Sequence, residues 1–143
     1  MDCIFCDFIS GKRKTHEHYP DFSVSPIFEN EHTFVFLGIP NKLKEVDLLV
    51  IPKAHYSNLE DVPDKIQHEL MKTISVGLKI LMKKYGACKV LLNNGQNADQ
   101  YVFHAHFHLI PKDKNRKHCL LNIDSNQHKE ISEELKKEFN STK

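Results

Sequence analysis

The sequence predicts an α+β fold: an antiparallel sheet of about five strands, with one long helix on one face and a C-terminal helix. Two observations predict it. Short segments rich in β-branched and apolar residues are separated by turn residues, as strands are. One long segment in the middle of the chain, and another at its end, instead repeat apolar residues at helical spacing. Strands joined by short turns, with one helix between the third and the fourth, favour antiparallel pairing.

The first three strands are expected in the N-terminal part of the chain, after a short helical piece around Cys6–Ile9. That piece is followed by the polar segment 11–23, which resembles a flexible insert. "VSPIF" near 24–28 and "HTFVFLGI" at 32–39 are separated by "ENE", a connection suited to a hairpin. "VDLLVIP" at 46–52 is the third expected strand, and its proline stops it.

The long helix is expected over about residues 64–85. Asp61 or Asp64 is expected to cap its start, and Gly86 to end it. Its apolar stripe recurs at steps of three or four residues and consists of Ile66, Leu70, Ile74, Leu78 and Leu81.

Two more strands and a C-terminal helix complete the expected fold. "CKVLLNNG" at 88–95 is typical of a strand that runs into a turn, and "YVFHAHFHLIP" at 101–111 is typical of the next strand. The tail returns to helical spacing at Ile131, Leu135 and Phe139. This last segment is strongly charged, so its helix is expected to pack on the outside of the domain.

Length and charge narrow the classes of protein. The 143 residues fit one domain, and the 20 basic and 19 acidic residues leave a net charge of +1 with neutral histidines. This balance predicts neither nucleic acid nor a membrane surface as the main partner. No apolar run approaches the roughly 20 residues that cross a bilayer, and the first residues do not resemble a secretory signal. The expected location is the cytoplasm, with the nucleus as an alternative.

The segment "VFHAHFHLI" places His104, His106 and His108 at alternate positions, so on a strand they share one face. The imidazoles are expected on the open side of the sheet. One metal ion cannot hold all three, although an adjacent pair could share one. The outer Cα atoms would lie about 13 Å apart, whereas zinc binds imidazole nitrogen at about 2.1 Å. The opposite face, expected to pack on the helix, consists of Phe103, Ala105, Phe107 and Leu109.

Several blocks of the sequence resemble one known family. "HAHFHLI" is preceded in the chain by "CIFCDFISG", "LLVIPKAH", "NNG" and "QYVF", and together they extend from Cys3 to Pro111. In type and order they resemble zinc-containing members of the histidine triad (HIT) superfamily of nucleotidyl hydrolases and transferases. The resemblance implies a single HIT-like domain over 1–143, with a zinc knuckle and short helix at 1–10 and a C-terminal extension with a helix at 112–143.

The resemblance implies that His106 is the nucleophile, because the middle histidine of the family motif attacks the α-phosphorus of a nucleotide. A neutral imidazole suits this role, since its usual pKa of about 6.5 leaves one nitrogen unprotonated. The implied substrate is a nucleoside phosphoramidate or a dinucleoside polyphosphate of adenine or guanine, cleaved through a covalent nucleotidyl-histidine intermediate. His108 is implied to contact the phosphate or the leaving group, and Asn93 and Gln100 to bind phosphate oxygens.

The resemblance also implies a structural zinc ion. The two cysteines of "CIFC" need two further ligands, and the implied set is Cys3, Cys6, His55 and His104. On its spacing alone, the cysteine pair fits a redox pair about as well. Cys88 and Cys119 are interpreted as packing or surface thiols, and no structural disulfide is expected.

Three residues depart from the family pattern. Gly38 stands where many members have an acidic residue that binds the ribose hydroxyls. Asp47 stands where many have histidine, and it is expected either to orient a histidine or to contact solvent. Tyr101 replaces a small hydroxyl residue at the substrate site and is expected to reshape it. We therefore expect phosphoryl chemistry to be better retained than selectivity for purine ribonucleotides.

Other interpretations stay open at this point. The chain could be a non-catalytic, zinc-stapled nucleotide-binding or interaction module, or a metal-handling protein. Many relatives form a two-fold dimer through their sheets and long helices, so a homodimer is expected. The histidines outside the motifs are expected to be solvated: His16, His18, His32, His68, His118 and His128.

Overall fold

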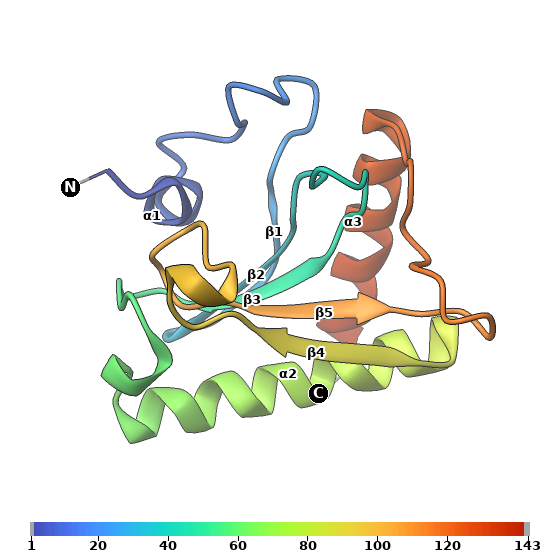
Figure 1. The fold of residues 1–143 in the computed structure, drawn as a ribbon. Coiled ribbons are helices and arrows are strands. Elements are labelled where there is room, and N and C mark those ends of the chain that lie inside the picture. Colours follow the sequence, from blue (N-terminus) through green and yellow to red (C-terminus); the bar gives the residue numbers. More distant parts are fainter. Residues whose placement is uncertain (1, 142–143) are drawn as a thin grey trace.

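The computed structural model describes residues 2–141, and its central element is an antiparallel five-stranded sheet with the order β1-β2-β3-β5-β4 (Figure 1). The predicted α+β architecture is confirmed, and each strand is shorter than its predicted segment. Residues 1 and 142–143 of the predicted domain 1–143 lie outside the described residues. The strands are β1 (Pro26–Glu29), β2 (Thr33–Leu37), β3 (Leu48–Pro52), β4 (Cys88–Leu92) and β5 (Phe107–Pro111).

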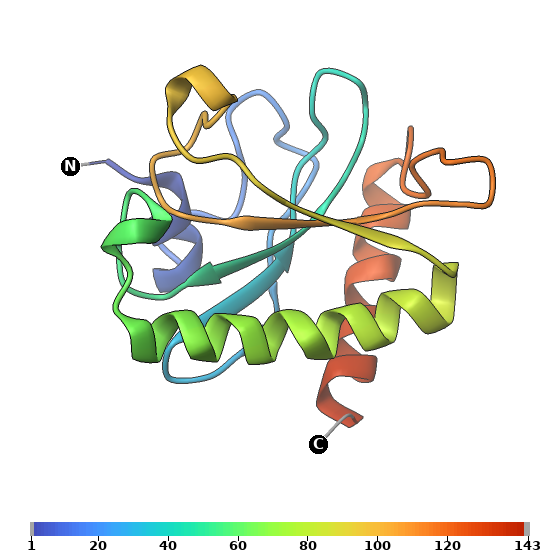
Figure 2. The ribbon, with the colours of Figure 1, turned by 60° about the horizontal axis from the view of Figure 1, so that its bottom comes forward.

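The long helix α2 (Asp64–Tyr85) covers one face of the sheet (Figure 2), and its predicted bounds are confirmed. Leu70, Ile74 and Leu81 of the predicted stripe are buried. They form one apolar cluster with strand residues such as Val50 and Leu109. Burial of this stripe is what stabilises the helix on the sheet, since intrinsic helix propensity alone is a weak preference.

The two ends of α2 differ in how well they were predicted. Gly86 ends the helix as expected, with a φ of 93° and an N–H that donates to the carbonyl of Met82. The predicted side-chain cap is wrong: the helix begins after Pro63, whose carbonyl accepts two N–H groups of the first turn. Asp61 lies earlier, in a short 3₁₀ segment, and Asp64 is itself the first helical residue.

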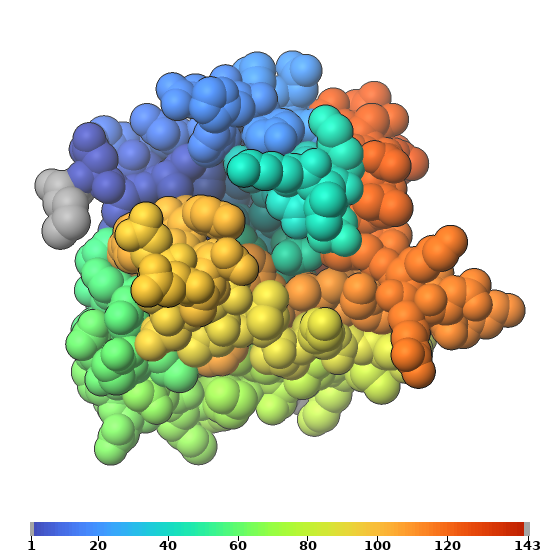
Figure 3. Space-filling model, viewed as in Figure 1, coloured from blue at the N-terminus to red at the C-terminus, as the bar shows by residue number. Residues whose placement is uncertain are grey.

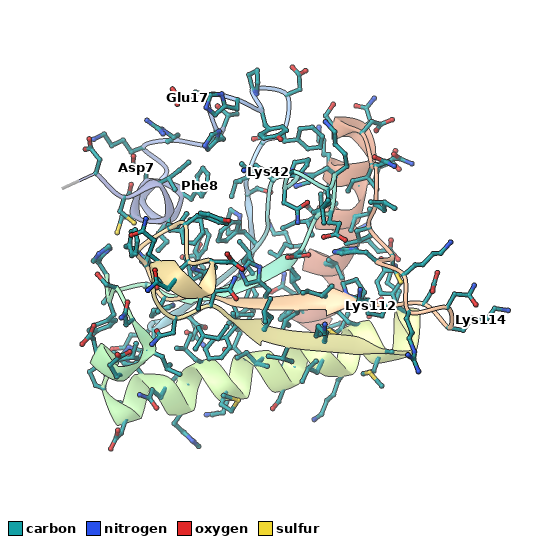
Figure 4. The ribbon with its side chains drawn as sticks, in the orientation of Figure 1. Asp7, Phe8, Glu17, Lys42, Lys112 and Lys114 are labelled. Carbon is teal, nitrogen blue, oxygen red and sulfur yellow. The ribbon has the colours of Figure 1, made fainter. Side chains whose placement is uncertain are left out.

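A short helix, α1 (Ile4–Ser10), covers part of the opposite face. Phe5 and Phe8 are buried and join Phe36 and Ile51 in a second apolar cluster. Figure 4, in which Phe8 is labelled, shows side chains filling the space between α1 and the sheet. Because both faces are covered, β2 and β3 are buried along their whole length. The expectation of one open face is therefore wrong over these strands.

The C-terminal helix α3 (Ser125–Ser141) packs against β1 and α2. Leu135 and Phe139 are fully buried, and the Phe139 ring stacks on Phe28 of β1 with centroids 5.7 Å apart. No helix among residues 2–141 combines the length and the apolar character needed to cross a bilayer. The helix thus lies at the periphery, as predicted, but contributes side chains to the main core.

Gly77 allows α2 to approach the sheet closely. A Cβ atom at this position would lie 2.9 Å from Leu109 Cδ1 and 3.3 Å from Phe139 Cζ, and both of these side chains are buried. Gly77→Ala is therefore expected to lower the free energy of unfolding in urea by roughly 1–3 kcal/mol, despite the higher helix propensity of alanine. Ser75→Ala, on the exposed side of the same helix, should leave it nearly unchanged. An equal or higher stability for Gly77→Ala would contradict this packing argument.

Candidate active site and metal centre

The histidine-rich segment is only partly a strand. β5 begins at Phe107 and pairs with both β3 and β4. The backbone before it is irregular, because the N–H of Ala105 donates to the carbonyl of Tyr56 at 2.7 Å, in a loop rather than in a strand. The predicted strand 101–111 is therefore wrong in its first half. Phe103, predicted to face the helix, is 48% exposed, whereas the other three residues of its set are buried.

His106 lies in the interior, between Phe5 of α1 and His108 of β5. Its ring centroid is 5.0 Å from that of Phe5 and 4.9 Å from that of His108, and only 6% of the residue is exposed. Nδ1 lies 2.7 Å from the carbonyl oxygen of His104. A carbonyl only accepts, so Nδ1 donates and Nε2 carries the lone pair. The ring is thus buried rather than exposed as predicted, because α1 covers it.

The protonation of His106 follows from this burial. Removal from water lowers its pKa to about 4, and the hydrogen bond to the carbonyl of His104 only partly opposes this shift. Near neutral pH the imidazole is therefore uncharged, with one free nitrogen.

His108 and Asp47 form a partly buried pair that continues to a third residue. His108 Nδ1 lies 3.0 Å from Asp47 Oδ2, and His118 Nε2 lies 2.7 Å from Asp47 Oδ1. Asp47 thus orients a histidine, which was one of the two alternatives expected for it. The expectation that His118 is solvated is wrong, because only 2% of its side chain is exposed.

Asp47 is expected to make stability depend on pH in acid. Burial raises the pKa of Asp47, but its hydrogen bonds with His108 and His118 lower it more, from 3.8 to about 2. Because the pKa is lower in the folded state, the carboxylate stabilises the protein above about pH 4. This contribution, on the order of 2 kcal/mol, is lost as the pH falls toward 2. The difference in unfolding free energy between wild type and Asp47→Asn, measured in urea, should therefore shrink between about pH 5 and pH 2. A constant difference across that range would contradict it.

The loop before the histidines is held by Gln100. Its side-chain nitrogen donates to the carbonyls of Ser57 and Val102, at 2.7 and 3.1 Å, and its oxygen accepts the N–H of Gly95 at 2.7 Å. The amide is buried and bonded to three backbone groups, and its predicted contact with phosphate stays a prediction. Asn93 donates to the carbonyl of Asp99 at 3.4 Å, and its predicted role stays a prediction.

A surface cavity of about 600 Å³ lies between the N-terminal segment and this loop, which meet in dark blue and gold in Figure 3. Tyr101, which is 78% exposed, and Phe103 line it on one side, and Lys12 and Arg13 on the other. Its lining residues do not include His106 or any other buried histidine. Tyr101 therefore faces this outer cavity rather than the buried ring of His106.

The four predicted metal ligands come together. Each offers one ligand atom, and these atoms all lie within 4.8 Å of one another; the residues are Cys3, Cys6, His55 and His104. The Sγ to Nδ1 distances are 3.5 Å for Cys3 and His104, 3.5 Å for Cys6 and His55, and 3.6 Å for Cys6 and His104. Tetrahedral coordination at zinc bond lengths separates sulfur and nitrogen ligands by about 3.6 Å. The group could therefore hold a metal ion.

The orientation of His104 suits a ligand. Its Nε2 lies 2.8 Å from the carbonyl oxygen of Pro52 and donates to it, so Nδ1 presents a lone pair to the sulfur atoms. Burial, and then the neighbouring Cys3, raise the pKa of Cys6 to about 11. A bound cation would offset this by stabilising the thiolate.

A family model for the HIT domain matches residues 23–115, which is more than half of the chain. The chain belongs to the HIT family. The match includes all five strands, α2 and the histidine-rich segment of this HIT protein. The residues that cover the second face of its sheet, in α1, precede the matched region.

Individual HIT proteins are similar to this chain. A HIT-like protein of Borreliella burgdorferi is 34% identical over 143 residues, 94% of this chain and 96% of that protein. An adenosine 5′-monophosphoramidase of Candida albicans is 34% identical over 116 residues, 77% of this chain and 70% of that enzyme. The crystal structure of a zinc-bound histidine triad family protein from Mycobacterium smegmatis has a TM-score of 0.74 at 23% identity, covering 100% of this chain and 99% of that one. This last likeness shows the shared fold.

Sequence reasoning missed two buried histidines of this HIT protein. His118 contacts Asp47, and His128 Nε2 donates to the carbonyl of Gly38 at 2.9 Å, so His128 is also not solvated as expected. The position of Asp47 at the start of an otherwise apolar strand segment was a signal that its carboxylate needs a buried partner. Nothing in the sequence pointed to His118 as that partner, because it lies 71 positions away.

Proposed function

We propose that this HIT protein is a nucleotidyl hydrolase that cleaves a nucleoside phosphoramidate or a dinucleoside polyphosphate at the α-phosphorus through His106. The observation that carries the proposal is the buried ring of His106, whose Nδ1 is bonded to a carbonyl and whose Nε2 is free to attack. The similarity to an adenosine 5′-monophosphoramidase supports the phosphoramidate in particular.

The reaction would proceed in two steps. Nε2 of His106 forms a bond to phosphorus as the bond to the leaving group breaks, and the leaving group departs with the electron pair and takes up a proton. The hydrogen bond from Nδ1 to the carbonyl of His104 stabilises the positive charge that the ring acquires. Water then attacks the phosphorus, the bond between phosphorus and Nε2 of His106 breaks, and the nucleoside monophosphate is released.

Trapping the covalent intermediate tests this proposal. The protein is mixed briefly with adenosine phosphoramidate or diadenosine tetraphosphate, quenched and analysed by mass spectrometry, and the added adenylyl mass should map to the peptide that contains His106. Gly38 and the exposed Tyr101, which depart from the family pattern, favour the second candidate, a nucleotide-binding module without catalysis. That module would bind the same nucleotides but show neither an adduct nor AMP release, and this outcome would overturn the hydrolase proposal.

We propose that the cluster of Cys3, Cys6, His55 and His104 binds a structural zinc ion. Two thiolates and two imidazoles form the soft, tetrahedral donor set that zinc prefers, and their spacing supports it. Bound zinc would link the N-terminal segment to the loops around the sheet. No step of the reaction runs through it, and among the three triad histidines His104 alone would serve as a ligand.

We also propose that the protein forms a homodimer through β4. Among residues 2–141 this edge strand pairs only with β5, and it exposes Val90 and Leu91 to solvent. Edge pairing across a two-fold axis would cover these side chains. Light scattering should give twice the chain mass for wild type and for Leu43→Glu, an exposed position outside β4, but the mass of one chain for Leu91→Glu. A monomeric wild-type protein would overturn this proposal.

A further inference from the structure

Asp47, His108 and His118 come together from three separate segments. Asp47 directly precedes β3, and the pairing of Leu48 with Leu109 sets it beside His108 of β5. His118 lies in the turn that follows β5, where Figure 4 labels Lys112 and Lys114. The three residues therefore depend on the register of the sheet and on the fold of one turn.

His118 has a defined orientation. Its Nδ1 accepts the backbone N–H of Leu120 at 2.9 Å, so its Nε2 carries the proton that is donated to Asp47. The N–H of Val46 donates to the carbonyl of Leu120 at 3.0 Å, which ties the same turn to the start of β3. Asp47 Oδ1 is thus held by a ring that cannot rotate without breaking these bonds.

The other carboxylate oxygen of Asp47 determines the orientation of the His108 ring. Oδ2 accepts the proton of His108 Nδ1 at 3.0 Å, which leaves Nε2 on the opposite side of the ring. Nε2 of His108 is buried and has no hydrogen-bond partner among residues 2–141. A buried ring nitrogen without a partner is costly unless a ligand supplies one. The ring also lies 4.9 Å from that of His106, beside the proposed nucleophile.

We propose that Asp47, held in place by His118, is a positioning residue that holds His108 as the cationic partner of an ion pair, with Nδ1–H bonded to Asp47, so that the second ring proton, on Nε2, is delivered to the leaving group. This inference rests on the proposed role of His106. As His106 bonds to phosphorus, the leaving nitrogen or oxygen takes the electron pair of its bond and the proton from His108 Nε2. In the second step Nε2 of His108 accepts a proton from the attacking water, which restores the starting state. Asp47 keeps its negative charge throughout, and no proton is gained or lost overall.

Asp47→Asn is the variant that tests this positioning. In this variant the amide oxygen would accept from His118, because the N–H of Leu120 fixes the tautomer of His118. The amide NH₂ would then face Nδ1 of His108 and favour a His108 ring that is protonated at Nε2. For adenosine phosphoramidate, whose amine leaves only with a proton, kcat should fall by about 10²–10⁴. For the p-nitrophenyl ester of AMP, whose phenolate leaves without one, kcat should fall less than about tenfold. Asp21→Asn, at an exposed position, should leave both rates unchanged.

Ring ¹⁵N NMR gives a second readout that does not need turnover. In wild type both ring nitrogens of His108 should carry a proton, and in Asp47→Asn only Nε2 should. If Asp47→Asn does not fold, His118→Gln is used instead. Its kcat should also fall more for adenosine phosphoramidate than for the p-nitrophenyl ester of AMP, but by a smaller factor than in Asp47→Asn. Equal losses of kcat for both substrates, or unchanged protonation of the two His108 ring nitrogens, would overturn the positioning role and leave the hydrolase proposal standing. Absence of turnover in wild type would overturn the hydrolase proposal instead, while the NMR result would still decide the orientation of His108.

Discussion

His106→Ala should abolish nucleotide turnover, with kcat/KM for adenosine phosphoramidate falling by a factor of about 10⁴ or more. The side chain would supply the only bond to phosphorus in the proposed first step, so no other interaction can compensate for its removal. Nucleotide binding should persist, because the substitution removes only the proposed nucleophile. The measurement is steady-state release of AMP, together with calorimetric titration of AMP.

Stability must be separated from chemistry in this experiment, because His106 is buried. Removing it leaves the carbonyl of His104 without its side-chain partner, which costs roughly 1–3 kcal/mol of stability. His128→Ala is the matched control: His128 is also buried and also bonds one carbonyl, that of Gly38, so it should lose comparable stability yet keep its turnover below the melting temperature. Turnover by His106→Ala within tenfold of wild type, about 1.4 kcal/mol in barrier height, would refute a covalent role.

Loss of the metal is the second large effect that we expect. Wild-type protein purified without chelator should contain close to one zinc ion per chain by plasma mass spectrometry, and Cys6→Ser should contain none. At free zinc about 100 times the Kd, binding stabilises the folded state by about 2.7 kcal/mol. Cys6→Ser and chelator-treated wild type should therefore melt several degrees lower. Cys119→Ser is the matched control and should keep both its zinc and its melting temperature, because Cys119 lies outside the cluster.

Loss of zinc should destabilise the N-terminal segment before it unfolds the whole domain. Phe5 lies between the cluster residues Cys3 and Cys6 in the sequence, and its ring packs against that of His106. Without zinc, α1 should separate from the sheet more often, and hydrogen exchange should accelerate in residues 3–10 while α2 stays protected. Zinc-free protein with unchanged melting and unchanged exchange in this segment would show that the cluster is not a structural zinc site.

Local pattern was a reliable guide where one face of an element is buried along its whole length. The bounds of α2 followed from the spacing of its stripe, because Leu70, Ile74 and Leu81 all pack on the sheet. Alternation was a poor guide before β5, since the same pattern fits a strand and an irregular segment whose N–H groups bond to a loop. Ala105 donates to Tyr56, and no local feature of the sequence indicates that distant acceptor.

Sequence resemblance and geometry contributed differently to the site. The motif spacing was enough to predict that Cys3, Cys6, His55 and His104 lie together, because each belongs to a block with its own recognisable residues. It did not indicate that the Gln100 amide is bonded to three backbone groups, since residue type alone does not reveal such partners.

The sequence alone was sufficient for the fold class, the helix periods, the family and the candidate metal ligands, because these depend on local spacing and on short motifs. Only the tertiary structure decided that His106 is covered by α1, that Gln100 is a loop support, and that Asp47 joins His108 to His118. Each of these depends on partners far apart in the chain. Burial and hydrogen-bond satisfaction are properties of the packed molecule, and no window of neighbouring residues contains them.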